Sequence, residues 1–307
     1  MPLAVFFRRA FALAAALLLA LPAVAAEAPG PAGPRTTDAA THLDYQEYLI
    51  PFTLDGHGPM LETRLVYPRG KGPWPLAVVT HGSPSDAADR RTRRLYPDAA
   101  RWFAAKGFLV AVVTRRGYGH SGGAWAEGAG LCSDPDYLAA GEATADDIVA
   151  AVRYLTHQKF VDPWRVVLVG QAAGGWGALA AAARNPEGVV AAINLAGGRG
   201  TRYEGLVCRS DHLIEAAAEW GRRDHAPTLW LYAENDTAIK PTLAAKMFDA
   251  YAKAGAGRAE FHGGFQGEFQ LVGPTHGIDG HRLLAAGPAT WGPAVEHFLE
   301  RFPGLLP

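Results

Sequence analysis

Residues 166–175 have the sequence VVLVGQAAGG. Four consecutive apolar residues, three of them β-branched, are typical of a buried strand, and the small residues that follow favour a sharp turn into a closely packed helix. Gly170 and Gly174 stand on either side of this turn, where the absence of a side chain allows the strand and the helix to approach each other. The stretch therefore predicts a strand–turn–helix unit.

The same alternation of apolar runs and helical segments extends over most of the chain, which predicts an α/β fold with a mostly parallel central sheet flanked by helices on both faces. An antiparallel pair is expected first, at residues 45–52 and 61–67. Parallel strands are then expected at residues 76–80, 108–114, 166–169, 189–195, 228–232 and 269–272. Helices are expected at residues 97–106, 141–156, 175–184, 241–254 and 290–301.

Composition indicates a single enzyme-sized domain. The chain has 307 residues, of which 49% are hydrophobic, and a net charge of -1, so nothing electrostatic favours nucleic acid as a partner. No composition break or repeat marks a second domain within residues 42–307, and residues 197–224, the longest excursion between strands, are interpreted as a short lid. The eleven histidines show no H-E-x-x-H pattern and the cysteines no C-x-x-C pattern, so no metal or other cofactor is expected.

The N-terminus has the order of a secretory signal peptide. Arg8 and Arg9 precede an apolar run at residues 10–21, and small residues follow at positions 23–26. A membrane anchor is the alternative, but the run is shorter than the roughly 20 residues that a spanning helix requires. We therefore expect removal of residues 1–26, a flexible leader at residues 27–41, and a periplasmic or secreted protein without stable membrane insertion.

Cys132 and Cys208 are the only cysteines. In an exported protein an even number of cysteines favours a disulfide. The order of elements places both residues in loops near the same rim of the sheet. We therefore predict that these two cysteines are bonded to each other.

Ligands of an open α/β sheet bind beyond the carboxyl ends of its strands, so the residues that follow each strand are the candidates for a site. After residues 166–169, the run from Gly170 to Gly174 fits the nucleophile-elbow pattern G-x-S-x-G, except that Ala172 takes the place of serine. Such an elbow projects one hydroxyl above the sheet, and alanine has none. The pattern indicates a site organised for acyl-group hydrolysis without its nucleophile, either through an introduced serine-to-alanine change or in a natural inactive relative.

Two further strand ends supply the other parts of such a site. The turn His81-Gly82-Ser83 could offer the backbone N–H of Ser83 to an oxyanion, with the N–H of Ala173 as the second donor, although an ordinary strand-ending turn has the same sequence. Asp236 is the best candidate for the triad carboxylate, Glu234 is the alternate, and a helix cap is another role for Asp236.

Two histidines, His276 and His281, follow the last predicted strand. Either could act as a general base, and spacing alone slightly favours His276 because it lies closer to the strand.

Residues 115–123 form a glycine-rich loop after the strand at residues 108–114. The loop lacks the Lys-Ser/Thr pair of a phosphate loop and the spacing of a dinucleotide site, so we interpret it as a wall of the pocket. Ser121 lies in this loop, outside any elbow context, and is a poor substitute nucleophile. Five aromatic residues could line an acyl or aryl pocket or simply cover the core: Trp125, Tyr137, Trp176, Tyr203 and Trp220.

Taken together, these motifs resemble the α/β-hydrolase superfamily, and specifically its bacterial dienelactone-hydrolase-like and dipeptidyl-peptidase-like esterases. The resemblance covers residues 43–302 and depends on residues 81–82, 116–122, 170–174, 234–236 and 279–281. In such relatives the closing histidine lies in an Asp-Gly-His segment followed by an apolar pair and a Trp-Gly-Pro helix start, here residues 291–293. The resemblance thus implies His281, not His276, as the base.

What the resemblance implies is a serine carboxylesterase acting on a small-molecule ester, with small acyl or aryl groups preferred because the lid is short. The departure at Ala172 predicts that this chain is inactive as it stands. A noncatalytic binding protein and a peptidase of the same fold are the alternatives.

Overall fold

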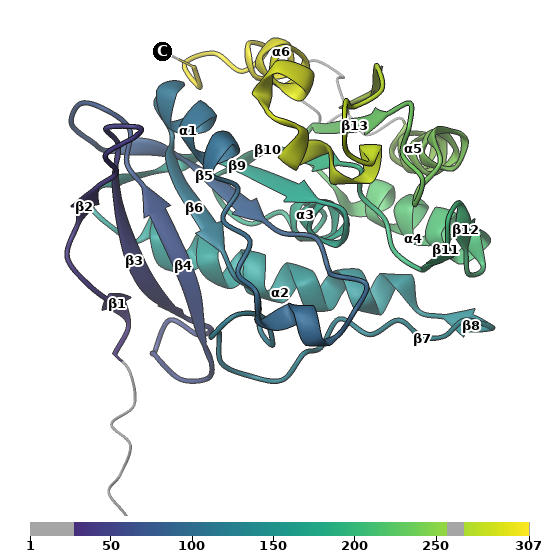
Figure 1. Cartoon of the computed structure of the whole chain (residues 1–307), viewed down its shortest axis with the longest axis horizontal. Helices are drawn as coiled ribbons and strands as arrows, with labels where there is room; N and C mark the ends of the chain where they lie inside the picture. Colours follow the sequence, from purple (N-terminus) through teal and green to yellow (C-terminus); the bar gives the residue numbers. More distant parts are fainter. Residues whose placement is uncertain (1–27, 257–266, 307) are drawn as a thin grey trace, which may run out of the picture.

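A mostly parallel sheet of ten strands forms the centre of the computed structural model, which describes residues 28–256 and 267–306 (Figure 1). The predicted signal peptide at residues 1–26 lies outside the described residues. Along the sheet the strands follow the order β1-β3-β4-β6-β5-β9-β10-β13-β14, and β2 pairs with β3. The strands are β1 (Gly30–Pro31), β2 (Thr36–Thr37), β3 (Asp44–Pro51), β4 (Met60–Val66), β5 (Trp74–Thr80), β6 (Leu109–Val113), β9 (Val161–Gln171), β10 (Val189–Leu195), β13 (Thr228–Ala233) and β14 (Gly267–Val272).

The pairing directions confirm the predicted sheet. β3 and β4 are antiparallel, as are β4 and β6, whereas every neighbouring pair from β6 through β5 to β14 is parallel. Residues 166–169 of β9 are fully buried because helices cover both faces of the sheet. The short strands β1 and β2 lie within the segment expected as a leader and pair with β3.

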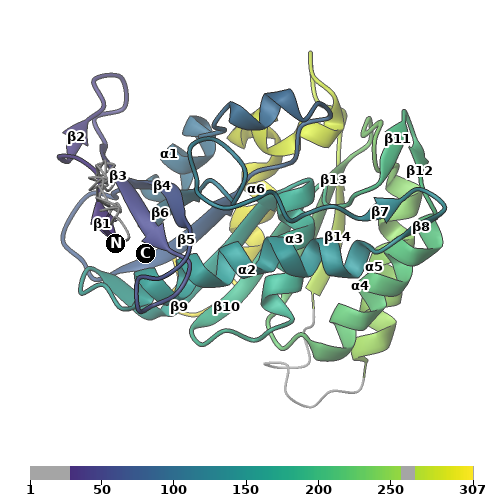
Figure 2. The same cartoon turned by 90° about the horizontal axis from the view of Figure 1, so that it is seen from below.

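Helices α1 and α6 cover one face of the sheet, and α2 and α3 cover the other, while α4 and α5 pack together at the β13 end (Figures 1 and 2). The helices are α1 (Pro97–Ala105), α2 (Tyr137–Thr156), α3 (Ala173–Ala182), α4 (Ser210–Arg223), α5 (Pro241–Gly255) and α6 (Pro288–Leu299), and a 3-10 segment, η3, spans Gly280–Ala286. The five predicted helices are confirmed to within a few residues. α2 begins four residues earlier than predicted, because the Asp136 side chain caps it by accepting the N–H of Ala139 at 2.8 Å.

Residues 197–224, interpreted from the sequence as a lid, contain a small hairpin and a helix. The hairpin consists of β11 (Thr201–Tyr203) and β12 (Leu206–Val207), and α4 follows it. Leu213, Ala216 and Trp220 are buried on one side of α4. Their helical spacing is the signal from which this helix could have been predicted.

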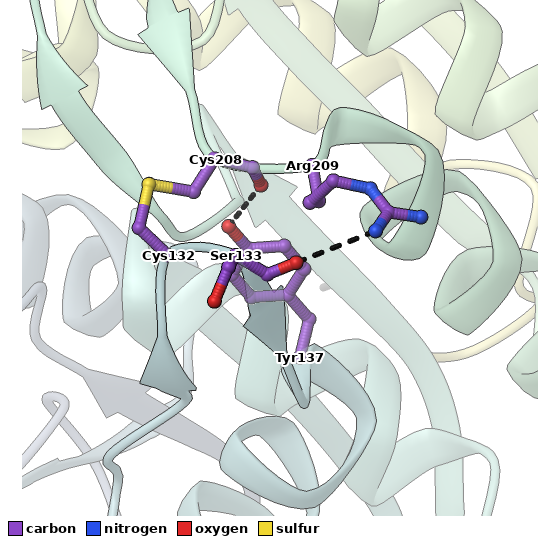
Figure 3. The surroundings of a disulfide bond; sticks show 5 residues. All are labelled: Cys132, Ser133, Tyr137, Cys208 and Arg209. Atoms are coloured by element: carbon purple, nitrogen blue, oxygen red, sulfur yellow. Dashed lines mark hydrogen bonds between the residues drawn. A yellow bond between two sulfur atoms is a disulfide. The ribbon is translucent and has the colours of Figure 1, made fainter.

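The predicted disulfide between Cys132 and Cys208 is present, with the two Cα atoms 5.1 Å apart (Figure 3). Cys132 lies at the tip of a second hairpin, β7 (Gly130–Leu131) and β8 (Asp134–Pro135), and Cys208 directly follows β12. Such a bond is typical of an oxidising compartment outside the cytoplasm. None of the helices within residues 28–256 and 267–306 has the length and apolarity needed to cross a bilayer.

Candidate active site

The turn between β9 and α3 holds Ala172 in a strained conformation, with φ 52° and ψ −118°. A positive φ is rare for a residue with a side chain and marks a turn that the surrounding structure imposes. The two glycines explain how the turn closes: a Cβ at Gly170 would lie 2.2 Å from the Gly174 carbonyl oxygen, and one at Gly174 would lie 2.5 Å from the His81 carbonyl oxygen. The chain thus retains the sharp, glycine-flanked turn of an elbow at a residue without a hydroxyl.

The structure brings His281 and Asp236 together. His281 belongs to η3, and Asp236 lies in the turn that follows β13; the His281 Nδ1 lies 3.2 Å from the Asp236 Oδ2. The Asp236 side chain is fully buried, while 25% of the His281 side chain is exposed. An imidazole that donates from Nδ1 to a carboxylate keeps Nε2 as a proton acceptor, which is the arrangement of a general base.

Asp236 does not cap a helix, the role considered as its alternative, but it holds the turn that precedes α5. Its Oδ1 accepts the backbone N–H groups of Ala238, at 2.9 Å, and of Ile239, at 2.8 Å, in the turn that leads to α5. The helix cap itself is Lys240. One carboxylate therefore organises its own turn with one oxygen and contacts the imidazole with the other.

Gln171, which the sequence analysis did not single out, connects the elbow to the segment that carries His281. Its amide nitrogen donates to the His281 carbonyl oxygen, and its Oε1 accepts the N–H of Leu284 at 2.6 Å. Asp279 adds a further restraint by accepting the His281 N–H at 2.7 Å. A glutamine next to an elbow residue has no distinctive pattern, so its role becomes visible only in three dimensions.

Two cavities meet beside Ala172. The first cavity has a volume of 410 Å³ and its lining includes Ser83, Tyr96, Ala172 and His281. The second cavity has a volume of 580 Å³ and its lining includes Ser83, Ala172, Ala173 and His281 together with residues 198–204. Ser83, Ala172 and His281 line both cavities, so a ligand that fills either one contacts all three.

The backbone groups proposed as oxyanion donors lie on the same cavity wall. A Cβ at Gly82 would lie 3.1 Å from the Ala172 Cβ, so the loop after β5 packs directly against the elbow. Within the described part of the chain, no hydrogen bond uses the N–H of Ser83 or of Ala173. Both N–H groups are therefore available to a ligand oxygen, as an oxyanion hole requires.

Beneath this loop lies a buried cluster of charges around Glu127, which lines the second cavity together with Arg199. Its carboxylate receives the guanidinium of Arg115 at both oxygens and that of Arg199 at 2.9 Å, as well as the Tyr118 hydroxyl at 3.0 Å. Burial alone would raise the pKa of Glu127, but Arg115 and Arg199 hold it well below the usual range of a glutamate. The Ser83 hydroxyl lies 3.3 Å from the same carboxylate, so the cluster fixes the loop that carries the oxyanion donor.

His81 belongs to this cluster and is a structural histidine. Its Nδ1 lies 2.9 Å from the Gly82 carbonyl oxygen, and its Nε2 accepts the N–H of Arg115 at 3.2 Å. Burial and the charge of Arg115 lower the pKa of His81 to about 3, so the ring is neutral at physiological pH.

The remaining candidates from the sequence lie away from the elbow or serve the core. His276 and Glu234 are exposed, and among the described residues the hydrogen-bond partner of the His281 Nδ1 is neither of them but Asp236. The Ser121 hydroxyl accepts the N–H of Glu62 and donates to the Thr114 carbonyl oxygen, which makes it a structural group of its loop. Of the five aromatic residues, Trp176, Trp220 and Tyr137 are buried, Trp125 is at the surface, and only Tyr203 lines either of the two cavities.

The strand order, the elbow between β9 and α3 and the histidine after the last strand define the α/β-hydrolase fold. Residues 96–203, which include the elbow, match the prolyl oligopeptidase family. No curated protein sequence matches the chain.

Solved structures share this fold over most of the chain. An acetyl xylan esterase from Paenibacillus sp. R4 matches with a TM-score of 0.57 and 16% identity, covering 88% of this chain and 86% of that one. An esterase of Pyrococcus furiosus matches with a TM-score of 0.58 and 15% identity, covering 90% and 99%. Dipeptidyl peptidase 4 of Porphyromonas gingivalis matches with a TM-score of 0.55 and 19% identity, covering 75% of this chain and 32% of that one.

Proposed function

We propose that this chain carries the site of a serine carboxylesterase for small acyl or aryl esters, in which Ala172 occupies the position of the nucleophile. The observation that carries the proposal is the coincidence of three features at one point: the strained turn at Ala172, the His281–Asp236 pair, and two backbone N–H groups, of Ser83 and Ala173, on the wall of the second cavity. No single feature is specific, but a hydrolytic elbow needs all three together.

With serine at position 172, the chemistry follows from these positions. The serine hydroxyl attacks the ester carbonyl while His281 accepts its proton, and the N–H groups of Ser83 and Ala173 bind the oxygen that becomes negatively charged. Collapse of this intermediate breaks the ester bond, and His281 returns the proton to the departing alcohol. Water, activated by the same imidazole, then releases the acid and restores the serine.

With alanine at position 172, the covalent step has no attacking atom. The substitution leaves every main-chain donor, the imidazole and both cavities in place, and Ala172 itself is only 7% exposed at the junction of the cavities. We therefore expect the chain as it stands to bind esters and their acids without hydrolysing them, since loss of such a nucleophile costs on the order of a millionfold in turnover.

A peptide substrate is the second candidate, favoured by the match of residues 96–203 to the prolyl oligopeptidase family. The same serine and base would cleave an amide, so the geometry at Ala172 does not separate the two bonds. Cavity size supports the ester, because volumes of 410 and 580 Å³ are those of small-molecule sites.

The test is the variant Ala172→Ser, assayed with 4-nitrophenyl acetate and butyrate and, in parallel, with peptide 4-nitroanilides. The matched control is Ala129→Ser, which adds a hydroxyl to the wall of the second cavity away from the elbow. Ester hydrolysis by the first variant alone supports the esterase, and peptide cleavage without ester hydrolysis supports the peptidase. If Ala172→Ser hydrolyses neither the esters nor the peptides, the site is not hydrolytic and the chain is a binding protein.

A further inference from the structure

Residues 199–209, which we name the clasped segment, carry the hairpin of β11 and β12 and end next to the disulfide. The front of this segment, residues 199–204, lines the second cavity together with Ala172 and His281. The back of the segment is bonded through Cys208 to Cys132 in the hairpin of β7 and β8 (Figure 3). The clasped segment therefore lines the candidate site on one side and is held by the disulfide on the other.

Several contacts beside the disulfide hold the clasped segment against the start of α2 (Figure 3). The Tyr137 hydroxyl donates to the Cys208 carbonyl oxygen, and Arg209 donates to the Ser133 carbonyl oxygen at 3.3 Å. Gly200 packs so closely that a Cβ there would lie 1.9 Å from the Tyr137 hydroxyl. This density of contacts fixes the segment in one position while the disulfide is intact.

At its first residue, the clasped segment reaches the oxyanion side of the site. Arg199 is 8% exposed, and it donates to the carboxylate of Glu127 at 2.9 Å and to the Glu127 carbonyl oxygen at 3.1 Å. The same carboxylate accepts the Ser83 hydroxyl at 3.3 Å. Arg199 thus anchors the first residue of the clasped segment in the buried cluster around Glu127.

At its hairpin, the clasped segment reaches the turn that holds the carboxylate of the base. The N–H of Gly205 donates to the Thr237 carbonyl oxygen at 2.5 Å, and the Thr201 hydroxyl donates to the Ala238 carbonyl oxygen at 3.2 Å. The N–H of Ala238 in turn donates to Asp236 at 2.9 Å. The segment therefore bridges the two halves of the site from outside.

The two hairpins joined by the disulfide also present large apolar side chains to solvent. Leu131 on β7 is 76% exposed, Tyr203 on β11 is 68% exposed and Leu206 on β12 is 56% exposed. Of the three, Tyr203 lines the second cavity and forms its apolar rim. Exposed apolar groups beside a cavity are typical of a surface that contacts a ligand.

We propose that the Cys132–Cys208 bridge determines specificity by positioning the clasped segment as the outer wall of the second cavity, so that acyl groups larger than acetyl are bound there. The inference rests on the proposed function, because it assigns the larger cavity to the acyl group of the ester. We expect an acetyl group to contact the wall formed by Ala172 and His281 and a hexanoyl group to extend to the wall formed by residues 199–204, which includes Tyr203. The longer group would then lose this contact when the segment is released.

The test uses Ala172→Ser with 4-nitrophenyl acetate and 4-nitrophenyl hexanoate, before and after reduction of the bridge by dithiothreitol, with thiol titration to show that it is open. We expect the KM for the hexanoate to rise about tenfold, its kcat to change less than twofold, and both constants for the acetate to change less than twofold. Reoxidation should restore the first values. The matched control adds Cys132→Ser and Cys208→Ser, after which dithiothreitol should have no effect.

A second variant covers the case in which reduction unfolds the chain. Thr201→Val keeps the bridge and the side-chain shape but removes the hydrogen bond to the Ala238 carbonyl oxygen. Its KM for the hexanoate should rise two- to threefold, and by a larger factor than its KM for the acetate. Equal losses for both esters, or no loss with the bridge fully open, would overturn the proposal.

Hydrogen exchange on the unaltered chain separates this inference from the proposed function. On reduction, amide protection should fall in residues 199–209 and persist in residues 236–239, α1 and α6. If Ala172→Ser hydrolyses no ester, the proposed function fails, and the exchange pattern still decides whether the bridge positions the segment. Uniform loss of protection would show a merely global stabilising role and would overturn the inference.

Discussion

Two polar regions lie on either side of the elbow, and each contains one histidine and one buried carboxylate. In the region around Glu127, both ring nitrogens of His81 have partners and the ring is 3% exposed. In the region around Asp236, one ring nitrogen of His281 contacts the carboxylate and 25% of the side chain opens to the cavities. The same two residue types therefore build a sealed support in one region and a group that can exchange a proton in the other.

The carboxylates differ in the same way. Glu127 is surrounded by two guanidinium groups and two hydroxyls, and its Oε2 alone accepts four hydrogen bonds from them. Asp236 has two backbone N–H groups on one oxygen and a single imidazole on the other. An imidazolium formed during a reaction would find its counter-charge at Asp236, whereas Glu127 is already neutralised by fixed cations.

We expect the greatest loss of activity when His281 is changed. Added to Ala172→Ser, the change His281→Gln should lower kcat for 4-nitrophenyl acetate by on the order of a hundred-thousandfold or more, because a serine without its base is a weak nucleophile. Steady-state kinetics and a check of the folded state by circular dichroism are the measurements. The matched control, His276→Gln, alters an exposed histidine and should change kcat less than twofold. If His276→Gln lowered kcat strongly and His281→Gln did not, His276 would be the base.

The next effect concerns the carboxylate. In the serine variant, Asp236→Asn should lower kcat by about ten-thousandfold, because an amide no longer fixes the imidazole tautomer or stabilises its charge. Glu234→Gln, which changes an exposed carboxylate two residues away, serves as the control and should be nearly silent. Pre-steady-state release of 4-nitrophenol would show whether acylation is the step that slows. A loss at Glu234 equal to that at Asp236 would contradict the assignment.

In the region around Glu127, the expected effect of a substitution is on stability. Glu127→Gln removes the negative charge that pairs with both Arg115 and Arg199, and breaking such a buried pair costs about 3–5 kcal/mol in the free energy of unfolding. Urea denaturation at pH 7 measures it. Asp98→Asn, which breaks the exposed pair with Arg101, is the matched control and should cost less than about 1 kcal/mol. If the two variants are equally stable, Glu127 is not the structural support that its contacts indicate.

The fold could be predicted from the sequence because its strands are buried on both faces and leave continuous apolar runs. Residues 166–169 illustrate this, and the glycines beside them have a steric reason that the structure confirms. α4 was missed because its apolar face is narrow and a long excursion between strands favoured the interpretation as a lid. The disulfide was predicted correctly, since only one pairing of two cysteines is possible.

The site was harder to predict than the fold, because its geometry depends on contacts between distant segments. Spacing alone favoured His276, and the change to His281 came from the resemblance to known esterases; the structure then places His281, not His276, beside Asp236. Gln171 and the cluster around Glu127 were not predicted, because a glutamine and a glutamate in loops have no pattern in sequence. Their partners lie up to 113 residues away along the chain. The catalytic roles themselves remain predictions for the experiments above.

The weakest expected effect is a pH dependence of stability that distinguishes His81 from His281. Because the pKa of His81 is lowered from 6.5 to about 3 in the folded state, the unfolded chain binds a proton between these values and the folded chain does not. The free energy of unfolding therefore falls as the pH falls through this window, and His81 contributes about 2 kcal/mol to this loss between pH 7 and pH 5.

Urea denaturation at pH 7 and at pH 5, with the unaltered chain and with His81→Asn, isolates the contribution of His81. The variant should be less stable at pH 7, but its free energy of unfolding should fall by about 2 kcal/mol less on acidification. His297→Gln, at an exposed histidine, should keep the full loss. An unchanged pH dependence in His81→Asn would mean that the ring takes up a proton while folded, and the contrast between the sealed and the open histidine would then no longer hold.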